Sequence, residues 1–267
     1  MNARATRWSW LALGGLAWAL AVPVGAAPAC DKPVYLTFDT GHMGVAPLVA
    51  EVLGRYRVKA TFFLADEKTL TGGSSLDDSW APWWRARAVE GHVFGSHTFD
   101  HVVWRADRPD GGFEVRPTAG PEAGRTLKMS AAQYCTELDR SAKRWQALTG
   151  QRMAPLFRAP GGRTSPALLA AAERCGWHHV PWSPAGFLGD ELPSDRYPNT
   201  ALLARALRDV RSGDILLAHL GIWSRQDPWA PAVLAPLIAG LQLRGLCFET
   251  LAEHPAYRSA IQQRGKP

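Results

Sequence analysis

Short apolar runs alternate with segments of helical periodicity along most of the chain. The apolar runs, which predict strands, are residues 34–38, 60–64, 92–96, 156–157, 215–218 and 247–251. The segments with helical spacing are residues 45–56, 130–148, 166–175, 200–210 and 232–243. Strands that alternate with helices are typical of a parallel sheet with crossover helices, so we expect an α/β barrel.

Two stretches interrupt this alternation. Residues 69–78 are rich in Gly and Ser, and residues 105–128 are rich in Pro, Gly and charged side chains. Such compositions favour turns and irregular backbone, so we expect both stretches to be surface loops. No internal repeat divides the remaining chain, which predicts a single domain.

The first residues have the features of a secretory signal. Arg4 and Arg7 precede an apolar run over residues 11–24, which is short for a membrane span and is followed by small residues. We therefore expect a signal peptide over residues 1–26 and one barrel domain over residues 27–267. The mature protein would have no stable membrane span and would act outside the cytoplasm, in the periplasm or extracellularly.

Export changes what the cysteines predict, because an even number usually pairs in an oxidising compartment. Cys135 and Cys175 lie on consecutive predicted helices, while Cys30 and Cys247 lie at the starts of the first and last strands. We expect these two disulfides, with buried free thiols as the alternative. A lipid anchor at Cys30 is the alternative to a cleaved, soluble form.

The formal net charge of the chain is +6. This charge is spread along the sequence, without the long Lys/Arg runs that are typical of nucleic-acid-binding segments. We expect a monomer that binds acidic glycan or lies near a charged envelope surface, and that binds no nucleic acid.

Four predicted strands run directly into side chains that can bind metals, carry charge or transfer protons. These side chains are Asp39, His97, Arg158 and His219, with His101 following His97. Carboxyl ends of barrel strands meet at one mouth, so these residues should lie together. Taken singly, each has a structural alternative, such as a helix cap, an ion-pair partner or a buried histidine.

The same segments resemble the ordered motifs of a known family. They are residues 36–41 (LTFDTG), 60–63 (ATFF), 91–101 (GHVFGSHTFDH), 157–162 (FRAPGG) and 213–219 (GDILLAH). Their order resembles that of the polysaccharide deacetylases, the NodB-homology domain of carbohydrate esterase family 4. The resemblance implies a distorted (β/α) barrel of about seven parallel strands that binds a divalent metal, with zinc as the expected ion.

The resemblance also implies a reaction, the hydrolysis of N-acetyl groups from an acetylated polysaccharide. Candidate substrates are peptidoglycan, poly-N-acetylglucosamine and chitin-like glycan. By their positions in the motifs, Asp39 matches the catalytic base, Arg158 its orienting partner and His219 the acid. His97 and His101 match the two metal-ligating histidines. These roles agree with the needs of amide hydrolysis, in which water loses a proton and the leaving amine gains one.

The wall of the substrate groove is expected at Pro160, Gly161 and Trp182. Gly161 stands where the family more often has an aromatic residue, which predicts a more open groove. Asp190 is a weaker candidate for the acidic residue that tunes the acid histidine.

The position after the predicted base differs from the family pattern. Thr40 stands where the resemblance implies an Asp that binds the metal, and a neutral hydroxyl is a poorer ligand for a dication. We expect weaker metal binding as a result. His42 is the candidate that could compensate from the next turn.

Two other functions fit parts of the sequence. The first is a catalytically weak or inactive barrel that binds glycan. Thr40 favours this function because it replaces the expected metal-binding Asp. The second is an amidase that acts on a small amide. Acetate release from acetylated glycans would separate the predicted enzyme from both.

Overall fold

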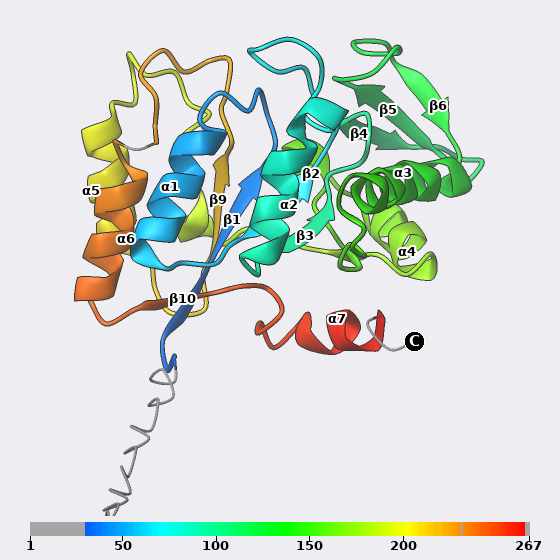
Figure 1. Ribbon diagram of the computed structural model, residues 1–267. Coiled ribbons are helices and arrows are strands. Elements are labelled where there is room, and N and C mark those ends of the chain that lie inside the picture. Colours follow the sequence, from blue (N-terminus) through cyan, green and yellow to red (C-terminus); the bar gives the residue numbers. More distant parts are fainter. Residues whose placement is uncertain (1–29, 231, 265–267) are drawn as a thin grey trace, which may run out of the picture.

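The computed structural model describes residues 30–230 and 232–264, and its centre is a parallel sheet (Figure 1). The strands of this sheet are β1 (Pro33–Asp39), β2 (Thr61–Leu64), β3 (Val93–Ser96), β7 (Leu156–Phe157), β8 (His178–His179), β9 (Ile215–His219) and β10 (Cys247–Glu249). All their pairings are parallel, as expected for strands that are joined by crossover helices.

The seven strands form a curled sheet in the order β10-β1-β2-β3-β7-β8, and β9 also pairs with β1, off this path. A parallel bridge between Phe187 and Leu217 links the chain beyond β8 to β9, which brings the two sides of the curl toward each other. The predicted barrel of about seven parallel strands is therefore confirmed, in the form of a half-barrel.

Helices cover the outside of the sheet in two packed groups (Figure 1). Helix α6 (Leu234–Leu243) packs against α1 (Ala46–Tyr56) and α5 (Asn199–Asp209). On the other side, α3 (Ala131–Thr149) packs against α2 (Ala81–Val89) and α4 (Pro166–Arg174). A short last helix, α7 (Arg258–Arg264), lies below the sheet in this view.

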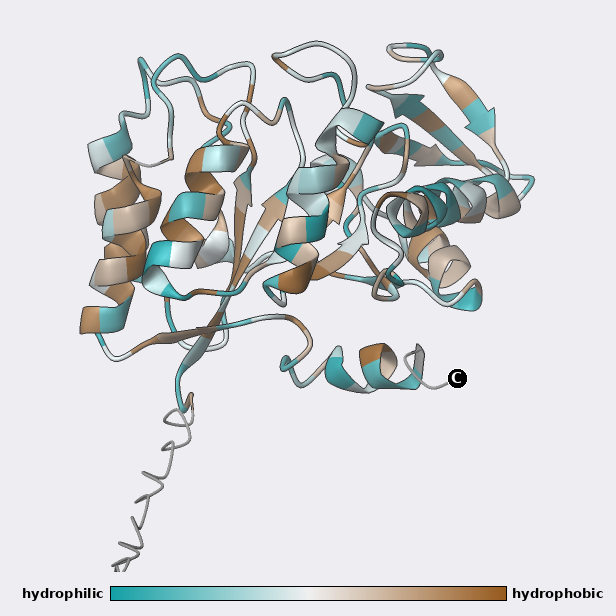
Figure 2. Ribbon diagram, viewed as in Figure 1, coloured by the Kyte–Doolittle hydropathy of each residue, from teal (hydrophilic) through white to brown (hydrophobic). Residues whose placement is uncertain are grey.

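Apolar side chains fill the space between the helices and the sheet. The brown segments of Figure 2 run along the strands and along α6, whose Leu234, Leu237, Ile238 and Leu241 are buried. Between β3 and α3, the rings of Phe94 and Trp145 stack with 4.0 Å between their centroids. These contacts hold the helices in place and fix the positions of the strand ends.

The longest helix begins and ends where the sequence predicts. The Ser130 side chain accepts a hydrogen bond from the Gln133 N–H, and the Gln133 side chain accepts one from the Ser130 N–H, which completes a capping box. Gly150 ends the helix with φ of 75°, a conformation that favours glycine. The Ser165 hydroxyl caps α4 in a similar way by accepting from the Leu168 N–H.

The prediction of a loop over residues 105–128 is wrong. This part of the chain contains an antiparallel sheet of β4 (Val102–Asp107), β5 (Phe113–Pro117) and β6 (Leu127–Met129). Buried and exposed residues alternate along β5, a period-two pattern that the surrounding Gly, Pro and charged residues obscure in the sequence. In Figure 1 this sheet stands beside the carboxyl ends of the parallel strands.

Three further short elements, which the sequence pattern did not predict, are α2, β8 and α7. Helix α2 lacks a clear apolar stripe because Trp83 and Trp84 are adjacent, and strand β8 has only two residues. The predicted loop over residues 69–78 is irregular apart from one bridge, between Lys68 and Ser74, and the first residue of a 3₁₀ turn (Asp78–Trp80).

The signal peptide that we expect over residues 1–26 lies outside the described residues. Within residues 30–230 and 232–264, no helix has the length and apolar character needed to cross a membrane.

Both predicted disulfides are present. Cys30 pairs with Cys247, with their Cα atoms 5.7 Å apart, and joins the chain before β1 to the first residue of β10. Cys135 pairs with Cys175, with their Cα atoms 6.3 Å apart, and joins α3 to the residue after α4.

We expect the Cys135→Ser/Cys175→Ser variant to lose about 2–4 kcal/mol of unfolding free energy, because a cross-link restricts the unfolded chain. Urea denaturation followed by circular dichroism measures this loss. The oxidised wild type and the wild type reduced under native conditions serve as controls. An unchanged denaturation midpoint in the variant would contradict the prediction, as would non-reducing peptide maps that recover Cys135 and Cys175 as free thiols.

Candidate active site

Asp39 is the last residue of β1, and its side chain is almost fully buried. Strand register places it opposite Phe63 of β2 and His219 of β9. Burial alone would raise the pKa of Asp39, but Arg158 above all, with His97 and His219 beside it, holds it below its usual range. The carboxylate is therefore ionised at neutral pH.

Arg158 follows β7 and is completely buried. Its Nη1 donates to Asp39 Oδ1 at 2.8 Å and to the Thr37 hydroxyl at 2.7 Å. Its Nε donates to the Val180 carbonyl at 3.2 Å, and its guanidinium lies 4.3 Å from the centroid of the Phe63 ring. These contacts hold the guanidinium, and with it one oxygen of Asp39, in a fixed orientation.

The two predicted metal-ligating histidines lie beside this pair. His97 Nε2 lies 3.5 Å from Asp39 Oδ2, and its Nδ1 is hydrogen-bonded to the Arg158 carbonyl at 2.9 Å. The His101 ring lies 4.8 Å from the His97 ring, centroid to centroid, and its Nδ1 is hydrogen-bonded to the Thr118 hydroxyl at 2.5 Å. Both rings use Nδ1 to bond to the protein, which leaves Nε2 for another partner.

Burial lowers the pKa of His97 to about 4, so this imidazole is neutral at pH 7. A neutral imidazole whose Nδ1 donates to a backbone carbonyl has a lone pair on Nε2, the arrangement that is common in metal-binding histidines.

His219, at the end of β9, forms the opposite wall. The Asp190 carboxylate accepts the His219 backbone N–H at 2.6 Å and lies 3.1 Å from the His219 Nδ1. Burial alone would lower the pKa of His219, but Asp190, Asp39 and Glu191 raise it to about 9. The imidazole is protonated at neutral pH, and the weaker sequence candidate Asp190 is placed as its direct partner.

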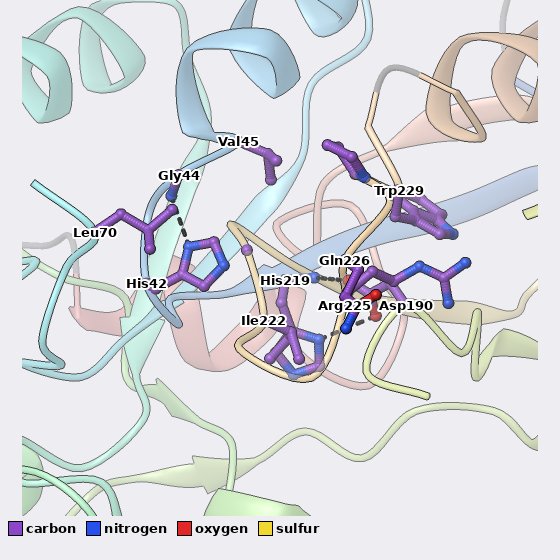
Figure 3. Close-up of a pocket in the computed structure, with 12 residues that line it drawn as sticks. His42, Gly44, Val45, Leu70, Asp190, His219, Ile222, Arg225, Gln226 and Trp229 are labelled. Carbon is purple, nitrogen blue, oxygen red and sulfur yellow. Dashed lines mark hydrogen bonds and ion pairs between the residues drawn. The ribbon is translucent and has the colours of Figure 1, made fainter. Parts of the chain in front are cut away.

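The structure places Thr40 and His42 in different surroundings. The Thr40 hydroxyl donates to Glu67 Oε2 at 2.5 Å. His42 Nδ1 accepts the Gly44 N–H at 3.0 Å, and its ring lies 5.0 Å from that of the exposed Trp223. His42 lines a neighbouring cavity of about 220 Å³, seen in Figure 3, and not the one that contains Asp39.

Glu67 is a site residue that the sequence reading missed. It lies just beyond β2, so the rule that carboxyl ends of strands meet at one mouth could have indicated it. Burial alone would raise the pKa of Glu67, but His101, the Thr40 hydroxyl and His97 hold it below its usual value.

These side chains surround one cavity of about 190 Å³. Its lining consists of Asp39, Glu67, His97, His101, Gly161, Trp182, Glu191, Leu217, His219 and Ile222. His219 and Ile222 also line the neighbouring cavity, so the two cavities share part of their walls. Both residues are labelled in the view of that neighbouring cavity (Figure 3).

The predicted groove wall lies partly at this cavity. Gly161 and Trp182 line it, while Pro160 is buried in the 3₁₀ turn Pro160–Gly162. A Cβ atom at Gly161 would meet no heavy atom within 4 Å, which agrees with a more open groove at this position. A Cβ atom at Gly162 would lie 2.4 Å from the Trp182 ring, so Gly162 allows the indole to approach closely.

The donor atoms of the cavity fit a dication by their chemistry, because imidazole nitrogens and carboxylate oxygens are the usual ligands of zinc. Within residues 30–230 and 232–264, however, no three His, Cys, Asp or Glu side chains are already arranged to hold an ion. Metal binding would therefore require at least one of these side chains to reorient.

Comparison with known proteins indicates the family of this chain. The family model of the polysaccharide deacetylases matches residues 26–180, more than half of the chain. The chain belongs to the polysaccharide deacetylase family. A chitooligosaccharide deacetylase from Azorhizobium caulinodans is 29% identical over 233 residues, which cover 83% of this chain and 93% of that protein.

A second relative of this deacetylase is the peptidoglycan-N-acetylmuramic acid deacetylase PdaA of Bacillus subtilis. It is 31% identical over 222 residues, which cover 83% of this chain and 70% of PdaA. Among solved structures, a family 4 acetyl xylan esterase from Clostridium thermocellum has a TM-score of 0.62 and 24% identity, covering 88% of this chain and 93% of that one. This likeness supports the fold.

We expect Asp190→Asn to lower the pKa of His219 from about 9 toward about 6.5, the value of a free imidazole, because it removes the adjacent negative charge. NMR titration of the imidazole carbon-bound protons measures the change. Because the raised pKa makes the protonated form stabilising, that stabilisation should be complete below about pH 6.5 and lost as the pH rises through about 9.

Asp195→Asn is the matched control, because Asp195 is exposed on the same connection. It should leave the His219 titration unchanged. A wild-type His219 that titrates near pH 6.5, the ordinary value, would contradict the assignment.

Proposed function

We propose that this polysaccharide deacetylase hydrolyses N-acetyl groups from an acetylated glycan with the help of a bound divalent metal. One observation carries the proposal: an ionised Asp39 and a protonated His219 face the same cavity as the His97 and His101 pair. Amide hydrolysis needs a base and an acid at the same time, and these two groups are held in opposite protonation states.

Asp39 acts as the base in this proposal. One of its oxygens is held by Arg158, which leaves Oδ2, the oxygen near His97, to accept a proton from water. The water oxygen then bonds to the acetyl carbon. Arg158 does not touch the substrate but orients the carboxylate, because three of its contacts lie in the buried barrel interior.

His219 acts as the acid. As the bond between the acetyl carbon and the sugar nitrogen breaks, the imidazolium gives its Nε2 proton to the nitrogen, and the products are acetate and a free amine. Asp190 binds Nδ1 and so directs the other ring nitrogen toward the substrate. Glu191 Oε2, 3.6 Å from Nε2, adds negative charge at the same place.

His97 and His101 would hold the metal, because each ring already uses its Nδ1 to bond to the protein. Zinc is the expected ion, and when bound it would polarise the acetyl carbonyl and lower the pKa of water. Trp182 offers an aromatic face on which a sugar ring could stack, and the open position at Gly161 leaves room for a polymer.

Peptidoglycan, poly-N-acetylglucosamine and chitin-like glycan all carry the N-acetyl group that the proposed reaction removes. The names of the relatives cover chitooligosaccharide and peptidoglycan substrates. The net charge of +6 favours an anionic envelope polymer, and the two disulfides suit work in the periplasm or outside the cell.

An inactive glycan-binding barrel is the second candidate, because the described residues include no preformed group of three metal donors. Acetate release from the three polymers, with and without chelator, separates the two. The deacetylase should release acetate from at least one polymer and lose this activity with chelator. An inactive binder would release none.

We expect Asp39→Asn and His219→Ala each to lower acetate release roughly a hundredfold or more, because each removes one proton transfer. Enzymatic assay of acetate, together with thermal unfolding of each variant, separates loss of chemistry from loss of fold. Asp195→Asn serves as the control for substitution on the exposed surface. Wild-type rates in either catalytic variant would show that the roles are misassigned.

The pH profile gives an independent check on the acid. Because His219 must be protonated to donate, kcat/KM should fall as the pH rises through about 9. In Asp190→Asn this alkaline limb should move to lower pH. A limb that stays in place would exclude His219 as the acid.

A further inference from the structure

The structure places a carboxylate directly beside the position where the family pattern has lost one. Thr40 replaces the Asp that the resemblance implies, yet its hydroxyl donates at 2.5 Å to Glu67 Oε2, and the Gly41 N–H donates to the same oxygen at 2.6 Å. We propose that Glu67 supplies the anionic metal ligand of this chain, as the third protein ligand beside His97 and His101. This inference rests on the proposed metal-assisted function.

The backbone around Glu67 ties it to the loop that carries both histidines. The Asp66 N–H donates to the Phe99 carbonyl at 2.7 Å, and Phe99 lies between His97 and His101 in the sequence. Glu67 and Ser75 also exchange hydrogen bonds, since the Glu67 N–H donates to the Ser75 hydroxyl at 3.0 Å and the Ser75 N–H to the Glu67 carbonyl at 2.8 Å. The start of the Glu67 side chain is therefore fixed beside the two imidazoles.

The carboxylate has one oxygen to offer. Both of its hydrogen bonds in the described part of the chain go to Oε2, and Oε1 makes none there. Glu67 lines the same cavity as His97 and His101, whose Nε2 atoms do not bond to the protein backbone. One carboxylate oxygen and two imidazole nitrogens form the donor set of a catalytic zinc site.

Glu67 also lacks the cation that a half-buried carboxylate normally requires. Asp39 is paired with Arg158 and Asp100 with Arg140, but no Lys or Arg lies within 4.0 Å of Glu67 among residues 30–230 and 232–264. A carboxylate held away from water without a cationic partner is costly. A dication between Glu67 and the imidazoles would supply the missing charge.

Thr40 acquires a positioning role. Its hydroxyl oxygen accepts the Ala65 N–H at 3.1 Å while its proton goes to Glu67, so the hydroxyl holds Oε2 in one direction. An Asp at position 40 would instead put a second carboxylate against Glu67, and two like charges at such a distance repel. Thr40 and Glu67 together therefore replace the Asp of the family pattern. The Thr40 hydroxyl orients the carboxylate, and Glu67 supplies that carboxylate from the end of the neighbouring strand, β2.

Zinc titration by calorimetry tests whether Glu67, oriented by Thr40, is the third zinc ligand. The test is a double-mutant cycle that needs no substrate. The proteins are the wild type, Glu67→Gln, Thr40→Asp and the combined variant, each freed of metal with chelator and checked by thermal unfolding. Gln keeps an oxygen that can accept from Thr40 and Gly41, so it removes the charge with little change in shape. Glu191→Gln is the matched control, because it removes one negative charge from the same cavity on the His219 side.

We expect Glu67→Gln to weaken zinc binding roughly tenfold or more, the size typical of perturbing a metal site. Thr40→Asp should not tighten binding in the wild type but should restore it in the Glu67→Gln background. Glu191→Gln should bind zinc within about twofold of the wild type, since the Glu191 side chain is 43% exposed and lies against His219 rather than against the two imidazoles. The visible absorption of bound Co²⁺ should change in Glu67→Gln and remain in Glu191→Gln.

Three results would overturn the proposal: no zinc binding by the wild type, wild-type affinity in Glu67→Gln, or equal tightening by Thr40→Asp in both backgrounds. Acetate release by the wild type distinguishes rejection of Glu67 as a metal ligand from rejection of the proposed deacetylation. Chelator-sensitive acetate release with wild-type affinity in Glu67→Gln would reject only the role of Glu67. Zinc binding that depends on Glu67 without acetate release would reject only the deacetylation.

Discussion

The buried ion pair between Arg158 and Asp39 is the interaction on which the active site depends. It joins the end of β1 to the end of β7 across the inside of the curled sheet, at an N–O distance of 2.8 Å. Removing one partner of such a pair typically costs about 3–5 kcal/mol, because the other charge is left without compensation. The barrel tolerates an ionised carboxylate in its interior only because Arg158, itself held by Thr37 and Val180, reaches it.

This ion pair also explains why the cavity has a negative group, Asp39, and a positive group, His219. Asp39 and His219 are neighbours in strand register, and each favours the charged form of the other. Arg158 keeps Asp39 negative from behind, and Asp190 keeps His219 positive from the opposite side. The carboxylate and the imidazolium therefore carry opposite charges before any ligand enters, which is the state that the proposed acid and base chemistry needs.

Much of this arrangement could be predicted from the sequence, because it follows from local rules. Alternating strands and helices gave the barrel, and polar residues after the strands identified Asp39, His97, Arg158 and His219. The sheet over residues 102–129 was missed because its strands are short and its turns dominate the composition. Glu67 follows the end of β2, so the strand-end rule could have indicated its place. Its contact with Thr40, across 27 residues of sequence, could not be predicted from spacing.

The disulfide between Cys30 and Cys247 determines how the domain can be presented at a surface. It fixes the described beginning of the chain at the start of β10, at the amino ends of the parallel strands. Helix α7 lies at this same end (Figure 1). The His254 ring, which precedes this helix in the sequence, contacts Tyr35 near the start of β1. The catalytic cavity opens at the carboxyl ends, on the opposite side. A support or scaffold attached through either end of the domain would therefore hold the cavity outward, facing a polymer too large to diffuse to it.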